Sequence, residues 1–474
     1  MSLDNSQHRM FHSTFDNIML MSDSYKACHW RQYPPKTEYI YSYFESRGGK
    51  FNETVFFGLQ YIVQRYFAGV VVTREKIDQA AQFFSLHFGS SELFNKAGWE
   101  YILENHGGCL PVSISAVPEG SVVENHNVLL TCVNTDPACF WLPNFLETLL
   151  VEVWYPSTVC TSSRAQKELI GRWLLATGSD LSGLEYKLHD FGFRGVSSLE
   201  TAALGGLAHL VNFKGTDTVP ACVLGSEYYN CPMAGFSIPA SEHSTITSWG
   251  RENEVLAFRN MLQQYPAGPV ACVSDSWNIF SACENLWGDA LKNVIMERPG
   301  RLIIRPDSGE PVEVVLHVLK ILGEKFGPLK KTKSGHFLLP DKIRVIQGDA
   351  VDFQMIDKIY TAMAAAGWAA DNVGFGSGGA LLQKFNRDTL KFAFKCSAVV
   401  IDGQEHAVWK DPITDPGKRS KKGRLALLHT DGKWTTVPAP NPKNVLEEIF
   451  RDGKVLKRCT LDEVRMRAAI VPSV

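Results

Sequence analysis

One repeating pattern constrains the fold of this chain more than any other feature. Between about residues 186 and 396, short apolar runs end in polar or glycine-rich loops, and a helical stretch follows each loop. The spacing of roughly 30 to 40 residues is typical of strand–helix units with parallel strands. The clearest units begin at 269–275, 301–307, 342–349 and 372–379, and earlier ones are expected at 188–192, 216–218 and 238–243. Six or seven such units predict an irregular βα barrel.

The rest of the chain predicts a second, discontinuous domain. Residues 111–117 and 128–133 have the pattern of antiparallel strands on either side of a Pro-Glu-Gly turn, and 140–176 have a helical pattern. After about residue 397 the helical signal fades and strand-like segments follow. We therefore predict an α/β protein with a βα barrel domain over 151–396, which carries most of the active site, and a flanking α+β domain made of 1–150 and 397–474.

Composition excludes several classes of protein. The 474 residues are 45% hydrophobic, and 48 basic against 50 acidic side chains leave a formal charge of −2, so no global basic surface favours nucleic acid. The N-terminus lacks a signal pattern, and no run is apolar enough to span a bilayer. The eleven cysteines contain no Cys-x-x-Cys pair and nothing that resembles a zinc site, and their odd number argues against a full disulfide framework. We expect a soluble, reduced, cytoplasmic protein with neither a nucleic acid nor a membrane partner.

Polar residues follow the predicted strands, where the loops of a βα barrel carry its chemistry. An aspartate at such a turn is also a common helix N-cap, so capping is the alternative interpretation for each one. That all of them only cap helices is the less favoured interpretation. The residues are Asp217, Glu242, His243, Asp275, Arg305, Asp307, Gly348, Asp349 and the run Ser377-Gly378-Gly379.

Two features indicate a phosphorylated substrate. The glycines of 376–379 follow a strand and precede a helical stretch, where backbone N–H groups bind phosphate, although an ordinary tight turn has the same pattern. A basic series follows, made of Arg387, Lys395, Lys410 and the run 418–424; a solvated loop or a nuclear-localisation signal is the alternative. Together with the aspartates, these features favour a sugar phosphate with magnesium. From the residues alone an aldolase, an isomerase and a transferase all remain open.

The chain resembles the nicotinamide phosphoribosyltransferase family in ten motifs that occur in the same order between about residues 15 and 465. They lie at 22–26, 32–35, 41–45, 190–198, 211–217, 242–246, 303–309, 345–349, 375–379 and 418–424. The resemblance implies a type II phosphoribosyltransferase, a pentosyltransferase of NAD salvage. Such an enzyme moves phosphoribose from phosphoribosyl pyrophosphate to nicotinamide and releases nicotinamide mononucleotide and pyrophosphate. It also implies a homodimer with active sites at the interface, Mg²⁺ as cofactor, and ATP as a coupled donor to a histidine.

The resemblance assigns the residues that bind nicotinamide. Phe191 of one subunit and Tyr25 of the other sandwich the ring, Arg305 lies near the nicotinamide and ribose, and Arg194 lies beside the ring and the phosphate. Asp217 accepts a carboxamide N–H, and its charge would repel the carboxylate of nicotinate. At about 4 Å and an effective dielectric constant near 20, that repulsion is roughly 4 kcal/mol.

The remaining roles concern the sugar phosphate donor. Asp307, Gly348 and Asp349 resemble the ribose and magnesium-side contacts, and Gly378 and Gly379 the 5-phosphate site, while the direct metal ligands stay unassigned. His243 resembles the phosphorylated histidine, Asp275 orients it, and these two with Asp307 are the expected catalytic residues. The cations that resemble pyrophosphate ligands are Arg47, Arg387, Lys395, Lys410 and Lys418.

One position departs from the family pattern, and three competing functions stand beside this hypothesis. Phe193 occupies a position where the pattern leads us to expect tyrosine. Nicotinate phosphoribosyltransferase shares the fold and the donor, but Asp217 argues against it. The intact set of motif residues argues against a non-catalytic binding protein. The lack of a suitably placed Schiff-base lysine argues against an aldolase-type barrel enzyme.

Overall fold

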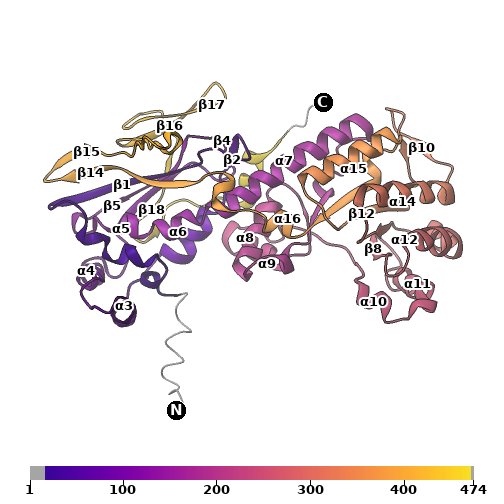
Figure 1. Cartoon of the computed structure of the whole chain (residues 1–474), viewed down its shortest axis with the longest axis horizontal. Helices are drawn as coiled ribbons and strands as arrows, with labels where there is room; N and C mark the ends of the chain where they lie inside the picture. The colour runs from indigo at the N-terminus through magenta and orange to yellow at the C-terminus, as the bar shows by residue number, and fades with distance from the viewer. Residues whose placement is uncertain (1–15, 471–474) are drawn as a thin grey trace, which may run out of the picture. The chain divides into compact units, whose positions relative to one another are not determined.

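The computed structural model describes residues 16–470 (Figure 1). They form two compact units, each of which collects segments that are far apart in the sequence. The predicted domain boundaries at 150/151 and 396/397 stay predictions. The chain passes from the flanking unit to the barrel unit at 161/162 and returns at 384/385. The flanking unit contains 16–161, 228–230 and 385–468, and the barrel unit contains 162–227, 231–384 and 469–470.

The barrel unit is built on one parallel sheet, and every neighbouring pair of its strands is parallel. Six of the predicted strand–helix units are therefore confirmed. In spatial order the strands are β7 (Gly215–Thr216), β6 (Leu188–Asp190), β13 (Val373–Ser377), β12 (Ile343–Gln347), β9 (Leu302–Arg305) and β8 (Val270–Val273).

The seventh predicted strand, at 238–243, is wrong. Residues 236–241 make only isolated bridges, but these reach both edges of the sheet. The Thr216 N–H donates to the Phe236 carbonyl over 3.0 Å at the β7 edge, and the Ser241 N–H donates to the Ala271 carbonyl over 3.1 Å at the β8 edge. Pro239 has no N–H to donate, so a continuous ladder cannot form through it. The barrel is consequently closed by an irregular segment.

Helices follow the strands and cover the sheet. In α14 (Pro311–Phe326), Val315, Val318 and Leu322 share one buried face, and the Glu310 side chain caps the first turn. The other helices lying mainly in this unit are α7 (Trp154–Thr177), which enters it at residue 162, α8 (Leu199–Leu210), α9 (Val219–Tyr229), α10 (His243–Thr247), α11 (Glu254–Gln264), α12 (Ile279–Ser281), α13 (Lys292–Glu297), α15 (Phe353–Ala365) and α16 (Gly379–Leu382). A small hairpin pairs β10 (Lys330–Lys331) with β11 (Phe337–Leu338).

The flanking unit is built on a seven-stranded antiparallel sheet, whose long strands β14, β1 and β5 are visible in Figure 1. Its order confirms that strands from the first 50 residues pair with those of 105–135 and with the C-terminal part. The strands are β15 (Gln404–Ala407), β14 (Ala393–Ile401), β1 (Thr37–Glu45), β5 (Val128–Asn134), β3 (Val112–Ala116), β18 (Glu447–Arg451) and β19 (Lys454–Val455). Two further antiparallel pairs join β2 (Glu53–Val55) to the distant β4 (Val122–Glu124), and β16 (Leu425–Thr430) to β17 (Lys433–Pro438) in a hairpin.

Helices of the flanking unit confirm one prediction and correct another. The helical segment 140–176 is present as α5 (Leu142–Phe145), α6 (Glu147–Val151) and α7 (Trp154–Thr177), the last of which continues into the barrel unit. The C-terminal part is not free of helix, because α17 (Leu461–Ala468) follows the last strand. The others are α2 (Leu59–Ile62), α3 (Arg74–Phe88) and α4 (Lys96–His106). Among the described helices, none combines the length and apolar character that crossing a bilayer requires.

Candidate active site

Phe191 lies where the loops after three strands of the barrel unit meet. It directly follows β6, and its N–H donates to the Ser377 carbonyl of β13 over 3.0 Å. Its ring lies against the backbone of Gly376, where an added Cβ would lie 1.8 Å from Cε2 of the ring. A Cβ at Gly348, after β12, would be 3.7 Å from the same ring atom. The sequence predicted Phe191 and Gly348, and the structure places them close together, with the Phe191 ring against the backbone of Gly376.

Asp217 belongs to a hydrogen-bonded group that the sequence did not predict. Its Oδ1 accepts a hydrogen bond from His189 Nε2 over 3.0 Å and another from the Ser237 hydroxyl. Burial alone would raise the pKa of Asp217, but the hydrogen bond and charge of His189, then Ser237 and Arg305, lower it below its ordinary value. The carboxylate is therefore held in its ionised form. It caps no helix through these bonds, so the capping interpretation is wrong for Asp217.

His243 and Asp275 form the pair that the sequence predicted. His243 is the first residue of α10, and its Nε2 lies 2.9 Å from Oδ1 of Asp275, whose side chain is only 4% exposed. The second oxygen, Oδ2, accepts the Asp307 N–H over 3.1 Å and the Ser308 hydroxyl over 2.5 Å. Asp275 thus joins the histidine to the loop after β9. The sequence did not identify Ser308, because an exposed serine in a loop carries no distinctive pattern.

Arg305, the last residue of β9, and Asp307, on the loop that follows it, flank Gly348. Their closest charged atoms, Nη2 and Oδ2, are 3.8 Å apart. A Cβ at Gly348 would lie 3.1 Å from Oδ1 of Asp307 and 3.4 Å from Cδ of Arg305, which explains a glycine there. The Nε of Arg305 is buried and has no hydrogen-bond partner within the described chain. Asp349 follows Gly348, and the cap of the next helix, α15, is Asp352.

The glycine run closes the end of β13. Gly378 precedes Gly379, the first residue of α16, and the loop lies against the turn that carries Arg194, since a Cβ at Gly195 would be 3.1 Å from Cα of Gly379. Arg194 itself is exposed. The predicted 5-phosphate and ring-side residues therefore lie on adjacent loops, and the phosphate role itself stays a prediction.

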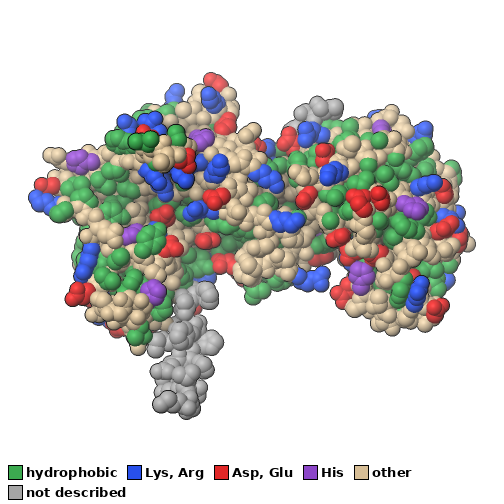
Figure 2. Space-filling model, viewed as in Figure 1, with side chains coloured by type: hydrophobic (Ala, Val, Ile, Leu, Met, Phe, Trp, Pro, Cys, Tyr) green, Lys and Arg blue, Asp and Glu red, His purple; other side chains and the backbone are tan. Residues whose placement is uncertain are grey.

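The predicted pyrophosphate cations all belong to the flanking unit, where most of them gather around Lys395. Burial, and then the charges of Arg47, Arg387 and Lys410, lower the pKa of Lys395, while Glu147 opposes the shift. The Lys418 ammonium instead points to the exposed Asp415, 3.2 Å away. Figure 2 shows basic side chains mixed with acidic ones on its visible face. The cluster is therefore a local concentration of charge.

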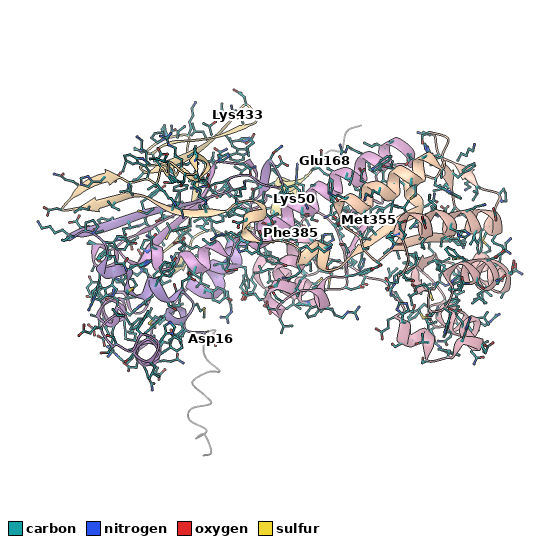
Figure 3. All side chains as sticks on the ribbon, in the orientation of Figure 1. Asp16, Lys50, Glu168, Met355, Phe385 and Lys433 are labelled. Carbon is teal, nitrogen blue, oxygen red and sulfur yellow. The ribbon has the colours of Figure 1, made fainter. Side chains whose placement is uncertain are left out.

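Arg47 is a largely enclosed member of this cluster, with its side chain 9% exposed. Its Nε donates to Oε1 of Glu45 over 2.7 Å, whereas its Nη2 is buried and has no hydrogen-bond partner within the described residues. Glu45 also pairs with Lys421, a contact that sequence reasoning missed. Lys50 lies nearby in sequence, with its ammonium 6.0 Å from the centre of the Phe385 ring (Figure 3). The unpartnered nitrogen leaves Arg47 able to donate to an anionic ligand.

Tyr25 also lies in the flanking unit and is 58% exposed. Its only aromatic neighbour among the described residues is His29, edge to face at 4.7 Å between ring centres. An exposed tyrosine ring of this kind is available for stacking. The structure contains one copy of the chain, so the role of Tyr25 in another subunit's site stays a prediction.

A cavity of about 530 Å³ lies in the barrel unit and is bordered by both partners of Asp217, His189 and Ser237. Lys187 also lines it, and burial lowers the pKa of this lysine to about 7. Its ammonium donates to the carbonyls of Ala370, Asp371 and Val373 within 3.0 Å. Lys187 precedes β6 instead of following it, and its donors are occupied. It therefore does not resemble a Schiff-base lysine, which argues against an aldolase.

Two groups of residues are candidates for binding a metal ion, one in each unit. Asp307 and Asp349 offer the carboxylate oxygens that magnesium prefers, at the strand ends where the sequence placed them. In the flanking unit, atoms of His106, Asp136 and Cys139 lie within 4.8 Å of one another. There the carboxylate already accepts a hydrogen bond from His106 over 2.8 Å, and a thiol and an imidazole suit a softer ion. The donor chemistry therefore favours the barrel unit for magnesium.

Solved structures of similar fold confirm the architecture. The chain superposes on a nicotinate-nucleotide pyrophosphorylase from Pyrococcus furiosus with a TM-score of 0.59 at 16% identity, covering 96% of this chain and 95% of that one. For human nicotinic acid phosphoribosyltransferase the TM-score is 0.57 at 16% identity, covering 94% and 92%. The predicted fold, an irregular βα barrel of the type II phosphoribosyltransferases with a flanking α+β domain, is confirmed.

Sequence comparison identifies the family. Residues 186–454 match the nicotinate phosphoribosyltransferase (NAPRTase) family, and residues 17–114 match the N-terminal domain of nicotinamide phosphoribosyltransferase. A nicotinamide phosphoribosyltransferase of Xanthomonas campestris pv. campestris (strain 8004) is 50% identical over 465 residues, 96% of this chain and 98% of the relative. One of Acinetobacter baylyi is 31% identical over 486 residues, 94% and 96% of the two chains. The chain belongs to the nicotinamide phosphoribosyltransferase family.

The contact between Phe191 and Gly376 generates a first prediction. In Gly376→Ala the new methyl group displaces the Phe191 ring, so transfer to nicotinamide falls by about tenfold or more while the protein stays folded. Initial rates and circular dichroism measure the two effects. Gly374→Ala is the matched control on the same strand, because its Cβ meets no atom closer than 3.8 Å. Equal losses in both variants would show that the ring contact is unimportant.

Proposed function

We propose that this chain transfers the 5-phosphoribosyl group of phosphoribosyl pyrophosphate to the ring nitrogen of nicotinamide. The products are nicotinamide mononucleotide and pyrophosphate, as NAD salvage requires. The observation that carries the choice of base is the ionised carboxylate of Asp217, fixed by His189 and Ser237 near the Phe191 ring. Membership of the family supports the reaction. The enzyme is a pentosyltransferase.

The site residues favour a dissociative substitution. The bond from C1′ to the pyrophosphate oxygen breaks, pyrophosphate leaves with the electron pair, and the nitrogen lone pair of nicotinamide forms the new bond. Positive charge develops on the ribose, so carboxylates such as Asp307 stabilise the transition state. The ring nitrogen is neutral and carries no proton, so the forward step needs no general base. Phe191 orients the ring by stacking, which contributes about 1 kcal/mol beyond buried area.

Asp217 selects the amide over the acid. Its carboxylate accepts an N–H of the carboxamide, whereas nicotinate would bring a second negative charge to the same oxygen. At about 4 Å and an effective dielectric constant near 20, the repulsion is roughly 4 kcal/mol, or about a thousandfold in relative binding. The same charge argues against nicotinate phosphoribosyltransferase as the function.

The flanking unit supplies the charge that binds the donor. The unpartnered Nη2 of Arg47, with Arg387, Lys395, Lys410 and Lys418, provides the donors that a diphosphate needs. Gly378 and Gly379 bind the 5-phosphate through their backbone N–H groups. Asp307 and Asp349 would hold magnesium, which when bound neutralises charge on the diphosphate.

The pair of His243 and Asp275 supports coupling to ATP. Asp275 accepts a hydrogen bond from one imidazole nitrogen, Nε2, which leaves Nδ1 as the nucleophile for a phosphoryl group. His243 is 44% exposed, so it is accessible to a phosphoryl donor. Because Asp275 also binds the loop of Asp307 and Ser308, a phosphoryl group on His243 would act on the loop beside the ribose.

A homodimer completes the proposed site. Tyr25 lies at an exposed position of the flanking unit and stacks on nicotinamide in the site of the partner. In the barrel unit, α9 and the segment after it leave Val219, Val223, Met233 and Phe236 about half exposed or more, and such apolar surface is typical of an interface. Analytical ultracentrifugation at assay concentration measures the subunit number.

We place the enzyme in the cytoplasm, where its eleven free cysteines stay reduced, and cell fractionation tests this placement.

Substitution of Asp217 tests the choice of base. In Asp217→Asn the preference for nicotinamide over nicotinate, as the ratio of their kcat/KM values, falls by about two to three orders of magnitude because the repulsion is removed. Product formation from the two bases in parallel gives the ratio. Asp289→Asn, an exposed aspartate of the same unit that pairs with Lys325, is the control. A wild-type preference for nicotinate would contradict the proposed substrate, and transfer to neither base would favour a binding protein.

Substitution of Arg47 tests the donor site. Arg47→Ala raises KM for phosphoribosyl pyrophosphate by about tenfold or more and leaves KM for nicotinamide nearly unchanged, because only the diphosphate loses a charged hydrogen bond. Steady-state kinetics with each substrate varied in turn separates the two constants. Arg451→Ala is the control, since Arg451 is an exposed residue that pairs with Glu448. An equal rise of both KM values would argue against a pyrophosphate role.

Substitution of His243 tests the coupling to ATP. His243→Ala retains magnesium-dependent transfer but loses any stimulation by ATP, since no imidazole accepts the phosphoryl group. Rates with and without ATP, and acid-labile phosphate on the protein, are measured in both enzymes. Phosphorylation that persists in the variant would place the acceptor elsewhere.

A further inference from the structure

We propose that His189 is a positioning residue that sets the preference for nicotinamide by holding the carboxylate of Asp217 in one orientation. The inference rests on the proposed function and deepens it. It assigns the choice of base to a pair of residues, where the sequence indicated Asp217 alone.

The His189 ring is fixed from three sides. Its Nε2 lies 3.0 Å from Oδ1 of Asp217, and its side chain is only 15% exposed. On the neighbouring strand it faces Gly215, its partner in the sheet register, where a Cβ would lie 2.7 Å from Nδ1 of the imidazole. The Phe191 ring lies 5.0 Å away between ring centres, tilted by 47°. The imidazole therefore has one place to lie, between the stacking ring and the carboxylate.

The hydrogen bonds to Asp217 are asymmetric. His189 and Ser237 both donate to Oδ1, which leaves Oδ2 to accept from the carboxamide of the base. Ser237 lies on the irregular segment that closes the barrel and not on a regular strand, so it constrains the carboxylate less than His189 does. A carboxylate that rotates freely presents its acceptor in the right direction only part of the time. Positioning within tens of degrees is what binding through one hydrogen bond requires.

The charge of the side chain at position 189 distinguishes positioning of the carboxylate from a merely structural role of His189. A hydrogen-bond donor at position 189 that carries no permanent charge orients the carboxylate and leaves its negative charge in place, so nicotinate stays repelled. A permanent cation at the same place would cancel that charge and attract the carboxylate of nicotinate. Loss of the donor, in contrast, lowers the efficiency of transfer only to nicotinamide, because only nicotinamide binds to the oriented acceptor.

Three substitutions separate these effects in the full-length enzyme. His189→Ala lowers kcat/KM for nicotinamide about tenfold and leaves the low value for nicotinate nearly unchanged, because only nicotinamide loses an oriented acceptor. His189→Gln keeps an N–H donor and restores most of the preference. His189→Lys introduces a cation and shifts the preference toward nicotinate. The measurement is kcat and KM for each base at saturating phosphoribosyl pyrophosphate.

The matched control is a second histidine–aspartate pair. His106 Nε2 lies 2.8 Å from Asp136 Oδ2 in the flanking unit, with side-chain exposures of 23% and 19%. His106→Ala breaks a bond of the same kind and leaves the preference unchanged.

The outcomes that overturn the inference are distinct from failure of the proposed function. Equal losses for the two bases in His189→Ala, or a glutamine variant that behaves like alanine, would reduce His189 to general support and overturn the inference. So would a wild-type preference for nicotinamide that all three variants retain. A wild-type enzyme that transfers to neither base would overturn the proposed function and this inference with it.

Discussion

The convergence of parallel strand ends is the constraint on which the site in the barrel unit depends. All six strands run the same way, so the residues that follow them meet at one edge of the sheet. This brings Phe191, Arg305, Gly348 and Gly376 into contact although they come from four different strand–helix units. Because Gly348 and Gly376 have no side chain, the backbone at β12 and β13 lies close to the Phe191 ring.

Within that edge, the polar residues act as connected groups. Asp217 depends on His189 and Ser237 for its orientation, and Asp275 ties His243 to the loop of Asp307 and Ser308. The carboxylates of Asp217 and Asp275 each accept hydrogen bonds from residues of other segments of the chain. In the flanking unit, an acid at Glu45 similarly organises Arg47 and Lys421. Substitution of one member is therefore expected to act through its partners as well.

Sequence reasoning succeeded where a pattern repeats along the chain. The alternation of apolar runs and glycine or aspartate loops was sufficient to locate six strands and the residues that follow them. It failed at 238–243, where an apolar run that contains Pro239 closes the barrel without a strand. It also could not choose between capping and binding for the aspartates, because both roles place the residue at the start of a helix. The partners of Asp217 and Asp275 decide that question, and they lie 28 and 32 residues away.

The sequence by itself determined the class of fold, the family and the candidate residues for the site, because short periodic segments and ordered motifs are local properties of the chain. Tertiary structure alone decided which of these residues work together. His189 has no distinguishing pattern, since a single histidine within a short strand is usually structural, and its role emerges only when β6 pairs with β7. Gly376 likewise becomes necessary only where the Phe191 ring, from a distant segment, lies against it. Contacts between remote segments depend on packing in three dimensions, which no local pattern records.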